Sequence, residues 1–375
     1  MNNIPVFHID GGDLLYLAKN IYKFPLDGLS PFNGMPQGVM ELSKESEALA
    51  KDEEFKNAVA VLCEPDLKLS QRRGGSTVPY EVSTLYIKKV KDKTNLVYLQ
   101  EDEGTVLATL FYDVASYAEY FAAQNASPVA EKPLNLMKSD LDIENLLFIF
   151  NLLDCYRRAY LNYMLQNSIE TVEAVYEDEF IYVFEKSLNS NDIRWLLPSF
   201  LKLVPSMEKV NMKFSDEQLD FAEAMDFVIR SINKEENRPI YYLGTNAKYM
   251  GLEFALLWKF GTGFEISAWN DKTKSIECKG RYYFAPTEEA NHLIKIISLE
   301  DKAKFIHTTL SLKEVEEEIK NILEEHLANT SKKEKFEIFA SKEQIKQDIS
   351  FCPNCGTKVE KGSSFCGSCG TKLTF

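Results

Sequence analysis

The chain has 375 residues, of which 45% are hydrophobic, and its formal net charge is −14. This length allows roughly two or three folded units, and the apolar content is ample for their cores. Residues 331–375 hold eight lysines and five acidic residues, which gives this segment a charge of +3 and leaves −17 for residues 1–330. A body that acidic repels phosphate backbones, so we expect it to bind no specific nucleic acid.

No apolar run approaches the roughly 18 residues needed to cross a membrane. The run at 145–153 is half that length and is expected inside a longer amphipathic helix. Residues 1–30 lack the basic start and the apolar stretch of a secretory signal. We therefore expect a cytoplasmic protein without membrane insertion.

Strand and helix patterns divide the first 125 residues clearly. Proline and glycine mark a loop at 24–38, and turn residues separate four consecutive strand-like runs. Asp113 stands where the cap of the last helix is expected. The predicted elements are, in order, a strand at 4–9, helices at 12–22 and 43–63, strands at 67–73, 81–90, 95–101 and 105–112, and a helix at 113–125.

A linker at 126–140 leads into the second part of the chain, where helical periodicity comes first and strand patterns return later. Ser215 and Gln218 have the spacing of a helical capping box. The predicted elements here are helices at 142–166, 171–187, 191–204 and 213–234, strands at 239–244, 252–260, 264–270 and 275–284, and a helix at 286–297.

The order helix, four strands, helix therefore occurs twice, at about 43–125 and 213–297, on either side of a helical insert at 141–204. The spacing from the first strand to the end of the last helix is close to equal in the two segments. We predict an α/β (α+β) fold of two pseudo-repeated, mostly antiparallel β-sheet units with flanking helices, related by a quasi-two-fold. This body would cover residues 1–328.

A further helix is predicted at 311–328, with Ser311 and Glu314 as its capping box. Its single apolar stripe is a candidate docking surface for a helical partner, and the alternative is that the stripe packs on the sheet as a second helix layer. The stripe residues predicted to bind the partner are Val315, Ile319, Ile322 and Leu323. A polar linker at 329–350 follows.

Cys352 with Cys355, and Cys366 with Cys369, form two C-x-x-C pairs, each followed by glycine. A tight turn inside each pair can point both sulfurs at one ion, and two pairs give a closed tetrahedral site. We therefore predict a zinc ribbon at 351–375 that binds one structural Zn²⁺. Two disulfides are the alternative, which a reducing cytosol disfavours. Four thiolates leave no open position for a substrate, so this zinc would not be catalytic.

The body contains no phosphate loop and no nucleophile elbow, so we predict no enzyme activity and no small-molecule substrate. Arg72 and Arg73 are a second candidate for partner binding, because they could pair with an acidic helix end; a plain turn is the alternative. The histidines, none with an obvious partner, are His8, His292, His307 and His326. The single cysteines, expected to be buried, are Cys63, Cys155 and Cys278.

Residues 59–125 resemble the EspG family, the cytosolic chaperones of type VII (ESX) secretion. The likeness lies in a helix followed by "PDL", a strand with Arg72, Arg73 and two glycines, the turn "DEG", and a closing helix. In looser form the order of elements matches over 1–300. The resemblance implies an α/β fold with a quasi-two-fold relation between two halves, and a role in holding secreted cargo. The zinc ribbon departs from that family.

The hypothesis that follows is a cytosolic chaperone or targeting factor that binds a helical region of a type VII secretion substrate. The Lys-, Asn- and Glu-rich composition is typical of low-GC Gram-positive bacteria. The resemblance then implies cargo such as an LXG-type toxin or its helical partners, in place of the PE–PPE pairs of mycobacteria. The alternatives are a zinc-ribbon nucleic-acid- or transcription-associated binding protein, an enzyme of unknown class, and another protein-interaction role such as an immunity protein.

Overall fold

The structure is a computed structural model. It describes residues 4–35, 41–74, 80–102, 104–129, 131–137, 140–168, 170–205, 207, 214–255, 261–299, 302–330, 350–351 and 358–359. The chain forms two compact units, which are residues 1–332 and 333–375.

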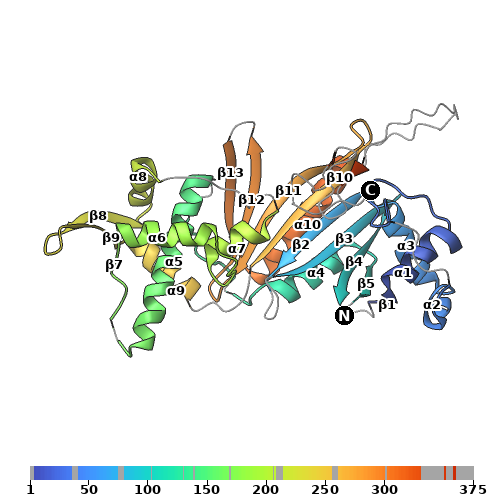
Figure 1. Ribbon diagram of the computed structural model, residues 1–375, viewed down its shortest axis with the longest axis horizontal. Coiled ribbons are helices and arrows are strands. Elements are labelled where there is room, and N and C mark those ends of the chain that lie inside the picture. Colours follow the sequence, from blue (N-terminus) through green and yellow to red (C-terminus); the bar gives the residue numbers. More distant parts are fainter. Residues whose placement is uncertain are drawn as a thin grey trace. The chain divides into compact units, whose positions relative to one another are not determined.

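The first unit is built on one ten-stranded sheet in which all neighbouring strands are antiparallel (Figure 1). The strand order is β1-β5-β4-β3-β2-β10-β11-β12-β13-β6. The strands are β1 (Val6–Asp10), β2 (Leu67–Arg73), β3 (Glu81–Val90), β4 (Lys93–Asp102), β5 (Thr105–Phe111), β6 (Asp140–Asp142), β10 (Thr262–Asn270), β11 (Ser275–Pro286), β12 (Asn291–Leu299) and β13 (Lys302–Leu310).

The sheet consists of two meanders that meet in the middle, where β2 pairs with β10. Each meander has four consecutive strands between two helices, and β1 or β6 extends its outer side. The helices are α3 (Glu53–Cys63) and α4 (Val114–Asn125) in the first repeat, and α9 (Thr245–Ala255) and α10 (Leu312–Thr330) in the second. The predicted fold class is confirmed, but the second repeat covers 245–330 and not 213–297.

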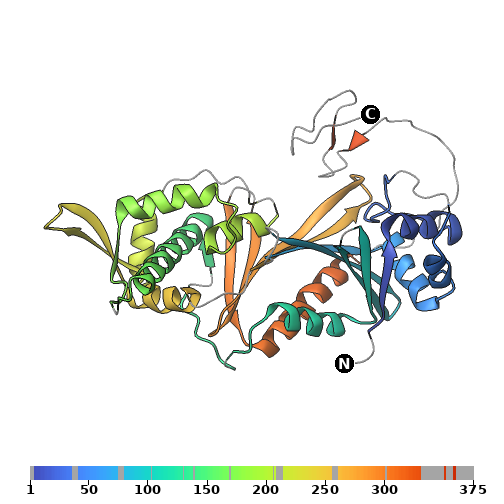
Figure 2. The same cartoon turned by 60° about the horizontal axis from the view of Figure 1, so that its bottom comes forward.

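Helices cover both faces of this sheet. On one face α4 and α10 lie side by side (Figure 2), and Phe121 of α4 packs edge-on against Phe264 and Phe284 of the second meander. The opposite face is covered by two groups of helices. They are α1 (Gly11–Tyr16), a π-helical turn (Leu17–Ile21) and α3 over the first meander, and α5 (Ile143–Leu165), α7 (Leu196–Leu203) and α9 over the second.

A small second sheet lies in the chain between the two repeats. Its strands are antiparallel in the order β7-β9-β8, and α6 packs against β7 and β9. The elements are β7 (Ala174–Tyr176), α6 (Glu177–Leu188), α8 (Asp216–Ala224), β8 (Val228–Asn233) and β9 (Arg238–Leu243). The segment predicted as a purely helical insert at 141–204 therefore also holds a strand.

Tertiary contacts overturn two predictions in the second half. The helix predicted at 213–234 ends early, because Asp226 has a φ of +53° and the chain then enters β8 to pair with β9. The strand predicted at 252–260 is helical as far as the structure describes it, since its described residues are the end of α9. There Gly251 lets α9 approach the ring of Tyr156 on α5, where a Cβ atom would lie only 2.5 Å from that ring.

The helix predicted at 286–297 is instead a turn followed by β12. The Thr287 hydroxyl accepts a hydrogen bond from the Ala290 N–H (2.9 Å), and the Thr287 N–H donates to the Ala290 carbonyl oxygen (2.8 Å). The Pro-Thr pair that resembles a helix start thus closes the connection between β11 and β12. The strand β13, which follows this hairpin, was not predicted.

Two further predictions hold only in part. The helix predicted at 43–63 is two helices, α2 (Lys44–Leu49) and α3, because Asp52 caps α3 by accepting a hydrogen bond from the Phe55 N–H (3.0 Å). Of the single cysteines, Cys63 and Cys155 are buried as predicted, whereas Cys278 is exposed.

The centre of the sheet depends on the close approach of α7 to β10. At Gly263 a Cβ atom would lie 2.2 Å from the Leu203 carbonyl oxygen, so a side chain there would collide with the end of α7. The start of α7 is fixed by Asp154 of α5, whose carboxylate accepts hydrogen bonds from the Leu196 N–H (2.8 Å) and the Leu197 N–H (2.9 Å). This helix therefore ties α5 to the junction of the two repeats.

Replacing Gly263 by alanine should lower the free energy of unfolding by about 3 kcal/mol, because the new methyl group must displace the backbone of α7. Gly11→Ala is the matched control, since its Cβ would have its nearest neighbour at 3.7 Å. That control should leave the free energy unchanged or raise it by about 0.5–1 kcal/mol. Urea unfolding of both variants measures the difference, and equal effects would contradict the role assigned to Gly263.

Candidate functional site

The apolar stripe of α10 faces the protein's own sheet. Val315, Ile319, Ile322 and Leu323 are at most 2% exposed, and they belong to the core between the sheet and helices α4 and α10. The alternative interpretation of the stripe therefore holds: α10 packs on the sheet as a second helix layer, and the stripe is its buried face. A partner could reach these four side chains only if α10 left the sheet, so a docking surface has to lie elsewhere.

Arg72, the first of the two arginines predicted to bind a partner, is engaged within the fold. Its Nη1 donates a hydrogen bond to the Lys202 carbonyl oxygen (3.1 Å), and its guanidinium carbon lies 5.5 Å from the centre of the Tyr80 ring. These contacts hold the end of α7 over β2.

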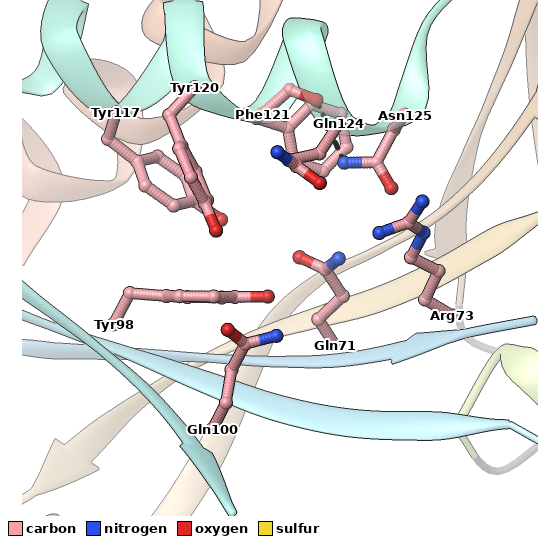
Figure 3. Close-up of a pocket in the computed structure, with 9 residues that line it drawn as sticks. All are labelled: Gln71, Arg73, Tyr98, Gln100, Tyr117, Tyr120, Phe121, Gln124 and Asn125. Atoms are coloured by element: carbon pink, nitrogen blue, oxygen red, sulfur yellow. Dashed lines mark hydrogen bonds between the residues drawn. The ribbon is translucent and has the colours of Figure 1, made fainter. Parts of the chain in front are cut away.

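Arg73, by contrast, points to the other face of the sheet and lines a hollow beneath α4 (Figure 3). The hollow is open to solvent, and the room inside it for the centres of water-sized groups is about 20 Å³. We name it the tyrosine hollow. Its lining residues, among which are one cation and no carboxylate, are Gln71, Arg73, Tyr98, Gln100, Tyr117, Tyr120, Phe121, Gln124 and Asn125.

The polar groups of the tyrosine hollow converge from two sides. Figure 3 shows the hydroxyls of Tyr117 and Tyr120 pointing from α4 toward the side chains of the sheet. On the sheet, Gln71 and Gln100 are both cross-strand neighbours of Ser83, so a polar row crosses β2, β3 and β4. Gln71 and Gln100 thus stand on a face of the sheet that otherwise carries the apolar core.

Two atoms of the hollow have no hydrogen-bond partner among the described residues. They are Oε1 of Gln71 and the hydroxyl of Tyr117, and these side chains are 3% and 1% exposed. A buried polar group without a partner costs about 1–3 kcal/mol. Both atoms therefore remain free to pair with a group that enters the hollow.

The tyrosines of the hollow are neutral at physiological pH. Burial raises the pKa of Tyr98 to about 12, although its hydrogen bond to Ser83 (2.8 Å) acts to lower the pKa. Burial also raises the pKa of Tyr117 well above its ordinary value, and it raises the pKa of Tyr120 against the opposing effect of Arg73. The hollow thus offers uncharged hydroxyls beside one guanidinium.

A second surface feature is the hairpin of β8 and β9, which Figure 1 shows at the left of the sheet. Ile229 and Tyr242 are cross-strand neighbours on one of its faces, and Ile232 and Pro239 on the other. Ile229, Ile232 and Tyr242 are 57%, 59% and 45% exposed. We name these four side chains the apolar hairpin surface. β8 is also the outer strand of its sheet, so one of its edges is unpaired within the described residues.

Two histidines form a buried pair, although the sequence indicated no partner for either. His292 Nδ1 lies 3.0 Å from His307 Nε2, and His292 Nε2 lies 2.8 Å from Glu253 Oε1. A third histidine, His326, contacts the Tyr282 hydroxyl at 2.9 Å. The sequence does not indicate the pair, because the pair joins β12 and β13, and the sequence pattern predicts a helix over the first strand and no element over the second.

The four cysteines of the predicted zinc site lie outside the described residues. Of the second unit the structure describes two short antiparallel strands, β14 (Ser350–Phe351) and β15 (Lys358–Val359), and Cys352 and Cys355 fall between them along the chain. Within the described ranges, no group of three or more His, Cys, Asp and Glu side chains is placed to hold a metal ion. No helix in those ranges has the length and apolar character of a membrane span.

Comparison with known proteins gives a family match for the ribbon segment and a likeness to solved structures. A zinc-ribbon domain family matches residues 351–373, in agreement with the predicted ribbon. A search of curated proteins gave no match. Among solved structures, the chain is similar to the type VII secretion system chaperone EspG5 of Mycobacterium tuberculosis, in a complex with a PE25–PPE41 dimer. The TM-score is 0.42 and the identity 9%, and the match covers 85% of this chain and 96% of that chain, which is a weak likeness.

The buried side chain of His307 should make the protein acid-sensitive. Burial holds the pKa of His307 well below its ordinary value, so the unfolded chain takes up a proton near pH 6.5 that the folded protein does not. Stability is therefore lost as the pH falls. Acidification from pH 7.5 to pH 5.5 should lower the free energy of unfolding by about 1.4 kcal/mol through His307 alone.

Urea unfolding at the two pH values tests this expectation. In His307→Gln the loss of stability on acidification should be smaller by about 1.4 kcal/mol, because glutamine does not titrate. His8→Gln, a change at an exposed histidine, should behave like the unmodified protein. The same loss in all three proteins would show that His307 takes no part in the acid response.

Proposed function

We propose that the protein is a cytosolic chaperone or targeting factor that holds a helical region of a type VII secretion substrate. The observation that carries the proposal is the apolar hairpin surface, where Ile229 and Tyr242 stand exposed side by side on one face of the hairpin. An amphipathic helix can lay its apolar stripe on such a surface. The EspG-like pattern of residues 59–125 supports the assignment to type VII secretion.

Polar contacts position the hairpin and leave its apolar side chains uncovered. Arg238 donates to both carboxylate oxygens of Asp178 on α6 (2.8 Å each), and its guanidinium lies 4.0 Å from the centre of the Tyr176 ring. On the other strand, Arg230 pairs with Glu223 of α8 (2.7 Å). Exposed ion pairs of this kind contribute little stability. They do, however, fix the surface before a partner arrives, which reduces the entropy lost on binding.

The cargo that we propose is an LXG-type toxin or one of its small helical partners. Such cargo would reach the secretion machinery with its helices shielded from other apolar surfaces. Binding to a nucleic acid is not part of the proposal, since the body is strongly acidic.

The second unit is proposed to bind one structural zinc ion through Cys352, Cys355, Cys366 and Cys369. The donor set fits this ion, because four thiolates in two C-x-x-C pairs are the ligands of a closed tetrahedral zinc site. Zinc bound there supplies folding free energy to the ribbon.

Changing Ile229 and Tyr242 together to aspartate should reduce cargo capture about tenfold or more, because two charges would lie beneath the apolar face of the cargo helix. The full chain is tagged and co-expressed with the N-terminal helical regions of LXG-type toxins from the native host, and bound cargo is quantified by mass spectrometry. Leu134→Asp, at a side chain that is 75% exposed elsewhere, is the control and should capture cargo normally.

The melting temperature should be the same for all three proteins, so that a loss of capture reports on the surface itself. If the unmodified protein captures none of these helical regions, the proposed function is refuted. If it captures one and the double variant does so equally well, the apolar hairpin surface is not the docking site.

Metal analysis of the purified full chain should find one zinc ion per molecule. Cys352→Ser should abolish stoichiometric zinc binding, since three thiolates hold the ion far less tightly than four. The same change should leave the melting of residues 1–332 unaltered, because this unit and the ribbon are separate compact units. A protein purified without zinc, or a body that melts at a lower temperature in the variant, would contradict the assignment.

A further inference from the structure

We propose that the tyrosine hollow binds one carboxylate group of the cargo protein, from an aspartate or glutamate side chain. The inference rests on the proposed function, because it adds a second contact to the same complex. The residues that form the two contacts are different, however. The tyrosine hollow is formed by elements of the first repeat, whereas the apolar hairpin surface belongs to the segment that lies between the two repeats along the chain.

The charge of the hollow favours a group with a single negative charge. Arg73 is the one cation among the lining residues, and its planar guanidinium can donate two parallel N–H bonds to a carboxylate. Glu81 is its cross-strand neighbour on β3. Within the described part of the chain, neither Arg73 nor Glu81 forms an ion pair. A phosphate dianion would call for more positive charge than one arginine supplies.

The uncharged polar groups of the hollow can also form hydrogen bonds to a carboxylate. The Tyr117 hydroxyl is buried, has no partner in the described residues and points into the hollow, so it can donate to a carboxylate oxygen. The amide of Gln71 can turn either its oxygen or its NH₂ group to an entering group. Because Tyr117 and Tyr120 carry raised pKa values, neither hydroxyl competes with the incoming anion by ionising.

The size of the hollow points to the end of a side chain and not to a whole ligand. The room inside it for the centres of water-sized groups is only about 20 Å³, far below the roughly 300–1,000 Å³ of small-molecule sites. The three heavy atoms of a carboxylate group fit such a space with the rest of the side chain outside it, whereas a nucleotide or cofactor does not fit. The walls are α4 and the strands β2 and β4, which share one buried core, so the hollow is formed before a partner binds.

The test uses the full chain and two probes, N-acetyl-glutamic acid α-amide and its neutral isostere N-acetyl-glutaminamide. Binding is followed in ¹H–¹⁵N spectra through the Nε–H signals of the arginines. We expect the acidic probe to shift the Arg73 signal saturably, with a Kd on the order of 1–10 mM, and the neutral probe to cause no saturable shift. Arg73→Met should weaken binding of the acidic probe at least tenfold, measured on the signals that remain.

Tyr117→Phe separates a binding site from a purely structural feature. Because the Tyr117 hydroxyl has no partner in the described residues, the phenylalanine variant should melt at the same or a higher temperature, yet bind the acidic probe several-fold more weakly. The matched controls are Tyr182→Phe and Arg194→Met, which alter an exposed tyrosine and an exposed arginine outside the hollow. Neither should affect the binding of the probe.

Three results would overturn the proposal. The first is the absence of saturable binding of the acidic probe. The second is unchanged binding of the probe in both Arg73→Met and Tyr117→Phe. The third is unchanged cargo capture by Arg73→Met, which would show that the carboxylate does not come from the cargo. Capture by the unmodified protein is measured in the same series, so a failure of the hollow is distinguishable from a failure of the chaperone function.

Discussion

The ladder between β2 and β10 is the interaction on which the rest of the first unit depends. It pairs Arg73 with Thr262 at one end and Lys68 with Ser267 at the other, and it is the join between the two meanders. Apolar packing crosses the same line, since Phe121 of the first repeat contacts Phe264 and Phe284 of the second. On the face covered by α4 and α10 the two repeats therefore share one core, and the helices on both faces close over a single continuous sheet.

The join also decides what each face of the sheet can carry. On one face the residue is Gly263, and because glycine has no side chain the backbone of α7 can approach the sheet there. On the other face the neighbouring position, Thr262, donates a hydrogen bond to the Asn125 side chain at the end of α4 (2.9 Å). One side of the join is thus filled by helix backbone, while the other admits polar groups and leaves space for the tyrosine hollow.

The sequence predicts the first repeat almost element by element because its signals are local. Turn residues separate the strands, and Asp113 caps α4 through the Ser116 N–H (2.7 Å). The second repeat is harder to predict, because β12 has apolar residues on both alternations and such a run has no clear period. A strand buried on both faces and a buried helix then have the same sequence pattern, and only the pairing with β11 and β13 shows that this segment is a strand.

The candidate sites differ in the same way: those with local sequence signals can be predicted, and those that depend on tertiary contacts cannot. The four cysteines are recognisable from their spacing because zinc ligands in a ribbon are close in sequence. The stripe on α10 indicates a buried face, but an amphipathic pattern does not say whether the protein's own sheet or a partner covers it. Arg72 and Arg73 must point to opposite faces of a strand, yet which of them meets an open space depends on α4 and α7. The unpaired atoms of Gln71 and Tyr117 have no counterpart in the sequence at all.

The long separation of the paired strands has a consequence during synthesis. About 190 residues lie between β2 and the strand that covers its edge, and a ribosome needs on the order of 10–40 s to add them. Throughout that interval the nascent first repeat presents an open strand edge, which other chains emerging from the same message can pair with. A protein proposed to cover the exposed surfaces of others would thus pass through a stage in which its own β2 has an uncovered edge.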